Sequence, residues 1–141
     1  MISRHTIVYA EDDADDLYMV KKAFEQHDHI QILHALNGLE AIELLEQMMT
    51  DNLKPCLVIL DINMPKLDGR ETLVRIKKNE STRDIPVVLF TTSSSNGDRH
   101  FGEQWGAEVF TKPLHYKDLE EIAMTFMNRC NFEINKLSAR Q

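Results

Sequence analysis

The chain has 141 residues, of which 16 are Lys or Arg and 23 are Asp or Glu, so its formal net charge is −7. This length suits one ordinary domain, and the acidic balance excludes a surface built to neutralise nucleic-acid phosphates or anionic lipid. No apolar run approaches the roughly 20 residues that a membrane span needs. Cys56 and Cys130 are too few for a disulfide framework and are typical of a reducing compartment. We therefore expect one acidic cytoplasmic domain that binds neither nucleic acid nor membrane.

Five short apolar runs are predicted to form strands. Their side chains are β-branched or otherwise apolar, as strands prefer, and the first, third and fourth runs are apolar almost without interruption. Such runs are typical of parallel strands that are covered on both faces. The predicted strands are residues 6–10, 30–35, 56–60, 87–90 and 107–111.

Amphipathic segments separate these runs and follow the last one. Apolar side chains recur in them at helical spacing, as at Leu17, Val20 and Phe24. Residues 98–105 form the weakest predicted helix, because Gly102 interrupts a thin apolar pattern. The alternation predicts an α/β fold, a doubly wound parallel sheet with helices on both faces. We assign residues 1–130 to one domain and residues 131–141 to a short polar tail.

Polar side chains follow four of the five predicted strands. Ligands of open α/β sheets bind outside the carboxyl ends of the strands, so these side chains are candidates for one shared site. The second strand, which ends in His34 and Ala35, contributes no obvious chemistry. The candidates are Glu11 and Asp12 after the first strand, Asp61 after the third, Thr91 after the fourth and Lys112 after the fifth.

Carboxylates that converge at one sheet edge repel each other, and a hard divalent cation relieves that repulsion. Mg²⁺ typically uses one or two carboxylates together with water and phosphate oxygens. We expect Asp12 and Asp61 as direct ligands, Glu11 acting through water, and the carbonyl of Asn63 as a further oxygen. Lys112 and Thr91 remain to bind a phosphoryl group, for which Asp61 would be the nucleophilic acceptor.

Several neighbouring polar residues have a simpler structural interpretation. They are expected to cap helices, to complete turns or to satisfy backbone groups in loops. The six histidines lack the spacing of metal ligands on a helix face. The residues interpreted in this way are Asp13, Asp15, Asp16, Asp68, Gly69, Ser93, Ser94 and Ser95.

Taken together, these motifs resemble the receiver domains of bacterial two-component response regulators, over nearly the whole chain. Each motif alone is weak evidence, but all four in this order at strand ends are highly specific. The resemblance rests on residues 8–13, residues 57–65 with Asp68 and Gly69, residues 85–92 and residues 110–113.

The resemblance implies a phosphorylation switch that is not an ordinary enzyme. Asp61 would accept phosphate from a phosphohistidine on a sensor histidine kinase or a histidine phosphotransfer protein, in a self-catalysed transfer followed by slow self-dephosphorylation. Glu11 and Asp12 would bind Mg²⁺ together with Asp61 and the backbone carbonyl of Asn63. The implied fold is flavodoxin-like, with five parallel strands in the order 2-1-3-4-5 and five helices.

In this family the added charge of about −1.5 to −2 biases a two-state surface. Thr91 would move toward the phosphoryl group and Lys112 would pair with it, with a cis peptide between Lys112 and Pro113. The surface usually comprises the fourth helix, the fifth strand and the fifth helix. Val109 stands where the family usually has Tyr or Phe, and Thr92 is bulkier than the usual Ala, so the chain departs from the pattern at both positions.

We expect no output domain after the eleven-residue tail. The signal would leave by protein–protein contact, by onward phosphotransfer or through a homodimer. Residues 64–71, with the acids Asp15 and Asp16, resemble stand-alone receivers such as those that serve phytochrome-type kinases. The dimer face would lie around Phe101, Trp105, Val109 and Tyr116.

Other functions fit the residues less well. A dehalogenase-type phosphatase would need a second aspartate as acid/base where Asn63 stands, and a flavin-binding module would need a Gly-rich phosphate loop where residues 11–16 are mostly acidic. A calcium loop fails at Pro65 and Thr72, which stand where ligands belong. A scaffold without chemistry would leave the coincidence of Asp12, Asp61, Thr91 and Lys112 unexplained.

Overall fold

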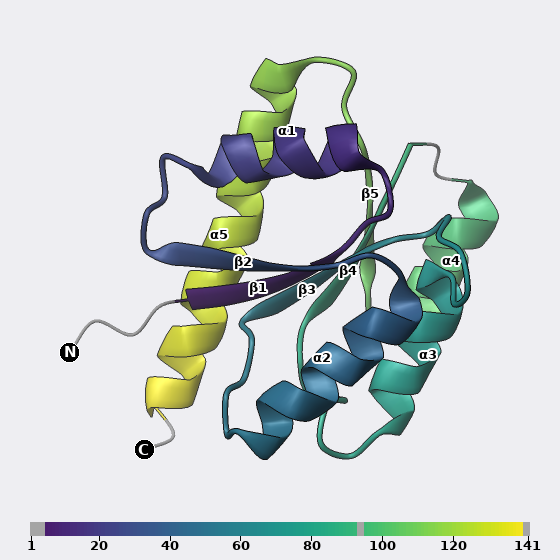
Figure 1. Ribbon diagram of the computed structural model, residues 1–141, viewed down its shortest axis with the longest axis vertical. Helices are drawn as coiled ribbons and strands as arrows, with labels where there is room; N and C mark the ends of the chain where they lie inside the picture. The colour runs from purple at the N-terminus through teal and green to yellow at the C-terminus, as the bar shows by residue number, and fades with distance from the viewer. Residues whose placement is uncertain (1–4, 93–94, 140–141) are drawn as a thin grey trace.

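Five parallel strands form one sheet in the order β2-β1-β3-β4-β5 (Figure 1). The computed structural model describes residues 5–92 and 95–139. Both the doubly wound fold and the predicted strand order are confirmed. The strands are β1 (His5–Ala10), β2 (Ile30–Ala35), β3 (Leu57–Asp61), β4 (Val87–Thr91) and β5 (Glu108–Thr111), and the helices are α1 (Ala14–Phe24), α2 (Gly38–Thr50), α3 (Gly69–Lys78), α4 (Asn96–Gln104) and α5 (Tyr116–Ala139).

Two apolar layers lie on opposite faces of the sheet. The helices α1 and α5 cover one face, and α2, α3 and α4 cover the other (Figure 1). Every residue of β3 and β4 is buried, as the continuous apolar runs predicted. Along β1 the side chains alternate, so that Ile7 and Tyr9 pack toward α1 and α5 while Val8 and Ala10 pack toward α2.

Local capping explains where the helices begin. Each of the first four helices follows a polar residue whose side chain accepts a hydrogen bond from the backbone N–H three positions later. These bonds satisfy donors that the first turn leaves without a helical partner. The capping residues are Asp13, Asn37, Asp68 and Ser95, so the predicted capping role of Asp13 and the turn at Asp68 are confirmed.

The helix α4 forms even though Gly102 interrupts its apolar pattern. A Cβ atom on Gly102 would lie 2.7 Å from the carbonyl oxygen of Ala107, so glycine lets this helix approach the start of β5 closely. Ser95 and Asp98 form a reciprocal capping box at the other end of the helix. The residue that weakened the prediction is therefore required by the packing of α4.

The C-terminal segment differs from its expected form. The helix α5 continues through Ala139, so most of the predicted tail at residues 131–141 is helical. Apolar and buried side chains explain this extension, because Cys130 and Glu133 are buried and Ile134 packs against the apolar layer beneath α5. The expected polar tail is therefore the end of the last helix up to residue 139, and the assignment of residues 1–130 to the domain stays a prediction.

Two covalent details also correct the sequence analysis. Cys56 and Cys130 form a disulfide that joins the start of β3 to α5, with their Cα atoms 4.8 Å apart, a bond that the sequence did not predict. A separation of 74 residues gave no sign of this contact. The described residues contain no cis peptide bond, so the bond between Lys112 and Pro113 is trans, against expectation.

Replacing Cys130 with Ala is expected to lower the free energy of unfolding by roughly 2–4 kcal/mol, because the disulfide closes a long loop in the unfolded chain. Urea unfolding of the oxidised wild type and the variant measures the difference. Wild type treated with a thiol reductant is the matched control and should approach the variant. Equal stability of the oxidised wild type and the variant would contradict this expectation.

Candidate functional site

Carboxylates from two strands meet at the carboxyl edge of the sheet. The site lies where the chain order of the strands reverses, between β1 and β3, which is where doubly wound sheets bind ligands. Glu11 and Asp12 follow β1, and Asp61 is the last residue of β3. Each of these three residues offers an oxygen, and the three oxygens all lie within 4.8 Å of one another. The predicted acidic cluster is therefore present.

The members of this cluster differ in exposure. Glu11 is fully buried and Asp61 is nearly so, whereas Asp12 is exposed. Within the described part of the chain, Oε2 of Glu11 is buried without a hydrogen-bond partner. A buried carboxylate oxygen without a partner is costly unless a proton or a cation occupies it. The donor set therefore fits a hard divalent cation, which prefers oxygen ligands.

Lys112 places a positive charge beside these acids. Its Nζ lies 2.5 Å from Oε1 of Glu11, 2.9 Å from Oδ2 of Asp16 and 3.6 Å from Oδ2 of Asp61. The contact with Asp16 adds a role that the sequence did not predict to the expected place of that acid at the start of a helix. Asp16 lies in the first turn of α1, and nothing in its own segment revealed that Lys112, nearly a hundred residues later, would reach it.

Burial and neighbouring charges shift the titration of the site. Burial raises the pKa of Glu11 to about 8, with Asp61 nearby acting in the same direction and Lys112 opposing it. For Lys112, burial disfavours the charge, but hydrogen bonds to Glu11 and Asp16 and the charge of Asp61 outweigh it and raise the pKa above its usual value. Without a metal, Glu11 therefore holds a proton near neutral pH while Lys112 keeps its charge.

Thr91 ends β4 at the same edge of the sheet. It follows Phe90, which is the register partner of Asp61, and it is buried. The backbone N–H of Lys112 donates to the carbonyl oxygen of Thr91 over 2.6 Å. The structure thus brings Thr91, Asp61 and Lys112 to adjacent strand ends. Of the hydroxyl-rich loop that follows, Ser93 and Ser94 lie outside the described residues.

A glycine allows the loop after Asp61 to fold back on itself. The N–H of Gly69 donates to the carbonyl oxygen of Ile62 over 2.9 Å. A Cβ atom at this position would lie 2.3 Å from the carbonyl oxygen of Asp61, closer than atoms can approach. The start of α3 can therefore pack against the backbone of the candidate phosphoacceptor only with glycine here. Asn63 is exposed in this loop, and its carbonyl remains a predicted ligand.

The two side chains at the centre of β5 pack on opposite faces of the sheet. Val109 packs against the α4 side, whereas Phe110 makes an edge contact with Phe126 of α5, with ring centroids 5.1 Å apart. The expected aromatic switch position is therefore occupied by an aliphatic side chain that packs against the same apolar layer as Phe101 and Trp105.

Sequence reasoning missed an ion pair that joins the starts of α3 and α4. Arg70 in the first turn of α3 pairs with Asp98 in the first turn of α4. A hydrogen bond from Arg70 lowers the pKa of Asp98 below its usual value, against the opposing effect of burial. The segment after Asp61 is thereby tied to the segment after Thr91. Neither residue belongs to a motif that would have revealed the pairing.

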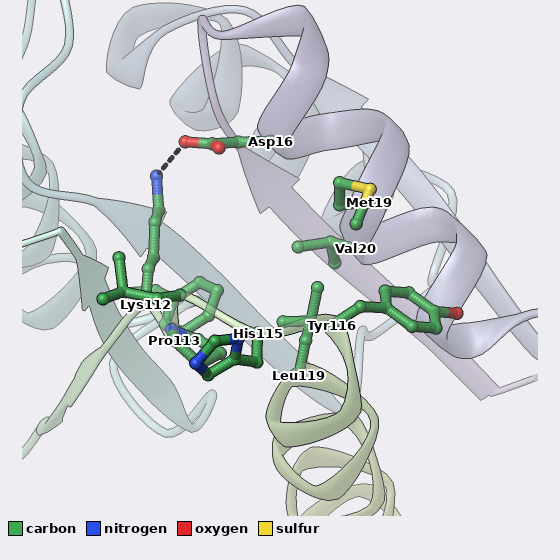
Figure 2. Close-up of a pocket in the computed structure, with 10 residues that line it drawn as sticks. Asp16, Met19, Val20, Lys112, Pro113, His115, Tyr116 and Leu119 are labelled. Atoms are coloured by element: carbon green, nitrogen blue, oxygen red, sulfur yellow. Dashed lines mark hydrogen bonds and ion pairs between the residues drawn. The ribbon is translucent and has the colours of Figure 1, made fainter.

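A pocket opens beside Lys112, between α1 and the segment that joins β5 to α5 (Figure 2). Apolar side chains line it, among them Met19, Val20 and Leu119. The ion pair between Asp16 and Lys112 lies at one end, as Figure 2 shows. An apolar surface therefore adjoins the charged site directly.

A family model of the response regulator receiver domain matches residues 7–124. The chain therefore belongs to the response regulator receiver family, whose members act in two-component signalling and are phosphoacceptor switches phosphorylated by histidine kinases. Among the helices of the described residues, none has the length and apolar character needed to cross a membrane.

Particular relatives resemble the chain over most of their length. It is 32% identical to Protein PilH of Pseudomonas aeruginosa, over 80% of this chain and 89% of that protein. It is 36% identical to Response regulator Rcp1 of Synechocystis, over 80% of each. The crystal structure of the phosphorylated cyanobacterial phytochrome response regulator RcpA superposes with a TM-score of 0.79 at 28% identity, covering 87% of this chain and 91% of that one. The structure of the Mn²⁺-bound form of Rcp1 superposes with a TM-score of 0.74 at 32% identity, covering 84% and 88%.

Proposed function

We propose that Asp61 accepts a phosphoryl group from a phosphohistidine and that the phosphorylated protein is the signalling form. The observation that carries this proposal is the meeting of Asp61 with Lys112, 3.6 Å away, and with the carboxylates of Glu11 and Asp12 at one sheet edge. A carboxylate in such a setting can act as a phosphoryl-accepting nucleophile.

In the proposed transfer, a carboxylate oxygen of Asp61 attacks phosphorus while the bond between phosphorus and the donor imidazole nitrogen breaks. The imidazole keeps the electron pair of that bond and takes a proton from solvent. Lys112 neutralises charge on the phosphoryl oxygens, and Thr91 is the hydroxyl that contacts them. Such transfers depend mainly on positioning and charge neutralisation, so the transfer is self-catalysed, and the aspartyl phosphate then hydrolyses slowly.

We also propose that Glu11, Asp12 and Asp61 hold Mg²⁺, with the carbonyl of Asn63 as a further ligand. When bound, this cation polarises and neutralises the phosphoryl oxygens as a Lewis acid. The partnerless buried oxygen of Glu11 supports a cation at this position, and the Mn²⁺-bound form of the relative Rcp1 supports a divalent ion.

The donor in this proposal is a sensor histidine kinase or a histidine phosphotransfer protein in the cytoplasm. The likeness to the phytochrome response regulator RcpA favours a phytochrome-type kinase, and the pocket beside Lys112 offers it an apolar contact. Residues 1–130 form the receiver domain. The output is protein–protein contact without nucleic acid, which the net charge of −7 supports, and the face formed by α4, β5 and α5 can serve a homodimer.

Intact mass after incubation with acetyl phosphate tests the acceptor. Wild type should gain one phosphoryl group when Mg²⁺ is present and none in EDTA, whereas Asp61→Asn should gain none. Asp13→Asn is the matched control, because it removes a nearby acid, keeps a capping side chain and should be phosphorylated like wild type. No gain in wild type, or an equal gain in Asp61→Asn, would contradict the proposal.

A further inference from the structure

A histidine of β2 bonds to the backbone of the acidic cluster. His34 is the fifth residue of this edge strand, and its ring is half-buried. Nε2 of His34 donates to the carbonyl oxygen of Glu11 over 2.6 Å. Because a carbonyl oxygen can only accept, this contact fixes the ring in a form that carries its proton on Nε2. The ring therefore acts as a donor to the residue whose side chain lies at the centre of the site.

The bond continues the pairing of β1 with β2 one residue beyond the end of β1. The register runs in parallel to Ala10 opposite Ala35, and the N–H of Glu11 then donates to the carbonyl oxygen of Ala35 over 3.0 Å. The side chain of His34 donates to the carbonyl oxygen of Glu11. Both polar groups of the Glu11 backbone are thus held by the last two residues of β2.

The side chain of Glu11 is held as firmly as its backbone. The hydroxyl of Tyr9, the register partner of His34, donates to Oε1 of Glu11 over 3.3 Å, and Lys112 contacts the same oxygen. Oε2 of Glu11 is thereby left buried without a hydrogen-bond partner, and one oxygen of Glu11 lies within 4.8 Å of oxygens of Asp12 and Asp61. Rotation of the peptide between Glu11 and Asp12 would turn both carboxylates, and His34 donates to the carbonyl of that peptide.

We infer that His34 is a positioning residue for the divalent-cation site. It fixes the peptide between Glu11 and Asp12 and so pre-aligns the carboxylates of both residues. This inference rests on the proposed function, because it takes the acidic cluster to be a cation site. Residues that orient metal ligands typically change metal affinity by about 10- to 100-fold when they are replaced, and we expect an effect in that range.

Two amide substitutions of His34 test whether its hydrogen bond to Glu11, and not only a polar side chain at this position, supports the site. The amide nitrogen of Gln corresponds in reach to Nε2 of His, whereas that of Asn corresponds to Nδ1 and falls short of Glu11. His34→Asn should weaken Mn²⁺ binding by at least tenfold, and His34→Gln should stay near wild type. His100→Asn, at an exposed position on α4, is the control and should bind like wild type. Titration of free Mn²⁺ by electron paramagnetic resonance measures the affinity directly.

The rate of phosphorylation by acetyl phosphate supplies a second reading. His34→Asn should need more Mg²⁺ for half-maximal rate but should reach the wild-type rate at saturation, a split that general loss of structure would not produce. Equal Mn²⁺ affinity of His34→Asn and wild type, or equal weakening in His34→Gln and His34→Asn, would overturn the role of His34. A wild type that binds no Mn²⁺ would overturn it too. Tenfold weaker binding in His34→Asn without any phosphorylation of wild type would support His34 and defeat only the proposed function.

Discussion

Replacing Lys112 with Met is expected to reduce phosphoryl uptake from acetyl phosphate by about 10²- to 10³-fold, as loss of a group that stabilises transition-state charge typically does. The same change should lower the free energy of unfolding in EDTA by about 2 kcal/mol. Loss of one partner of a buried ion pair commonly costs about 3–5 kcal/mol. We expect less here because Glu11, whose pKa is raised to about 8, already holds a proton near neutral pH and is not left as a bare charge.

Addition of Mg²⁺ should restore much of this stability, because a divalent cation can compensate Asp61 in place of the ammonium group. Mg²⁺ should not restore the rate of phosphoryl uptake, because the cation binds at the carboxylates and leaves the position of Lys112 without a hydrogen-bond donor. Lys117→Met, at an exposed position early in α5, is the matched control and should change neither quantity. Urea unfolding and intact mass measure the two effects. Wild-type uptake by Lys112→Met would contradict the role assigned to Lys112.

Short-range patterns predicted the sheet and its functional edge. Continuous apolar runs predicted the strands β3 and β4. The polar residues that end these runs, Asp61 and Thr91, were predicted as site residues. Because all strands are parallel, their carboxyl ends meet at one edge, so strand assignment alone brought Glu11, Asp61 and Lys112 together. Local sequence sufficed wherever the relevant contact followed from strand direction.

The side-chain contacts that sequence reasoning missed depend on a partner distant in the chain. Asp16 contacts Lys112 across 96 positions, and His34 contacts Glu11 across 23. Each of these residues has an ordinary local interpretation, as a first-turn acid or as a polar residue on an edge strand. Which interpretation holds depends on side-chain reach in the folded sheet. The disulfide of Cys56 was missed for the same reason.

Departures from the family pattern are also informative about the switch. The aliphatic Val109 lies beside α4, while the aromatic Phe110 is packed on the opposite face against Phe126. A side chain that is already packed against α5 is poorly placed to report on α4. The ion pair of Arg70 with Asp98 instead connects the loop after Asp61 to the start of α4. In this chain, a polar contact therefore joins the start of α3, which follows the proposed acceptor Asp61, to α4.

The metal-free protein is expected to lose stability as the pH rises toward 8. Burial, aided by Asp61, raises the pKa of Glu11 from 4.5 to about 8, so between these values the folded state binds a proton that the unfolded state has released. Stability falls with pH wherever the folded state binds more protons, by up to about 1.4 kcal/mol per pH unit for one group. Cation binding must displace this proton, so the apparent affinity for Mg²⁺ should rise with pH over the same range.

Urea unfolding in EDTA between pH 5.5 and 8, on wild type and on Glu11→Gln, isolates this contribution. Burial and the neighbouring His29 lower the pKa of His5. This histidine makes the free energy of unfolding rise with pH below about pH 6.5, opposite to the effect of Glu11. Both proteins share that histidine, so the difference between them reports Glu11 alone. The free energy of unfolding of Glu11→Gln should rise relative to that of wild type as the pH rises, because Gln cannot lose a proton. A constant difference across the range would show that Glu11 is already ionised, with Lys112 rather than a proton neutralising it, and the metal-free site would then carry one more negative charge than its burial predicts.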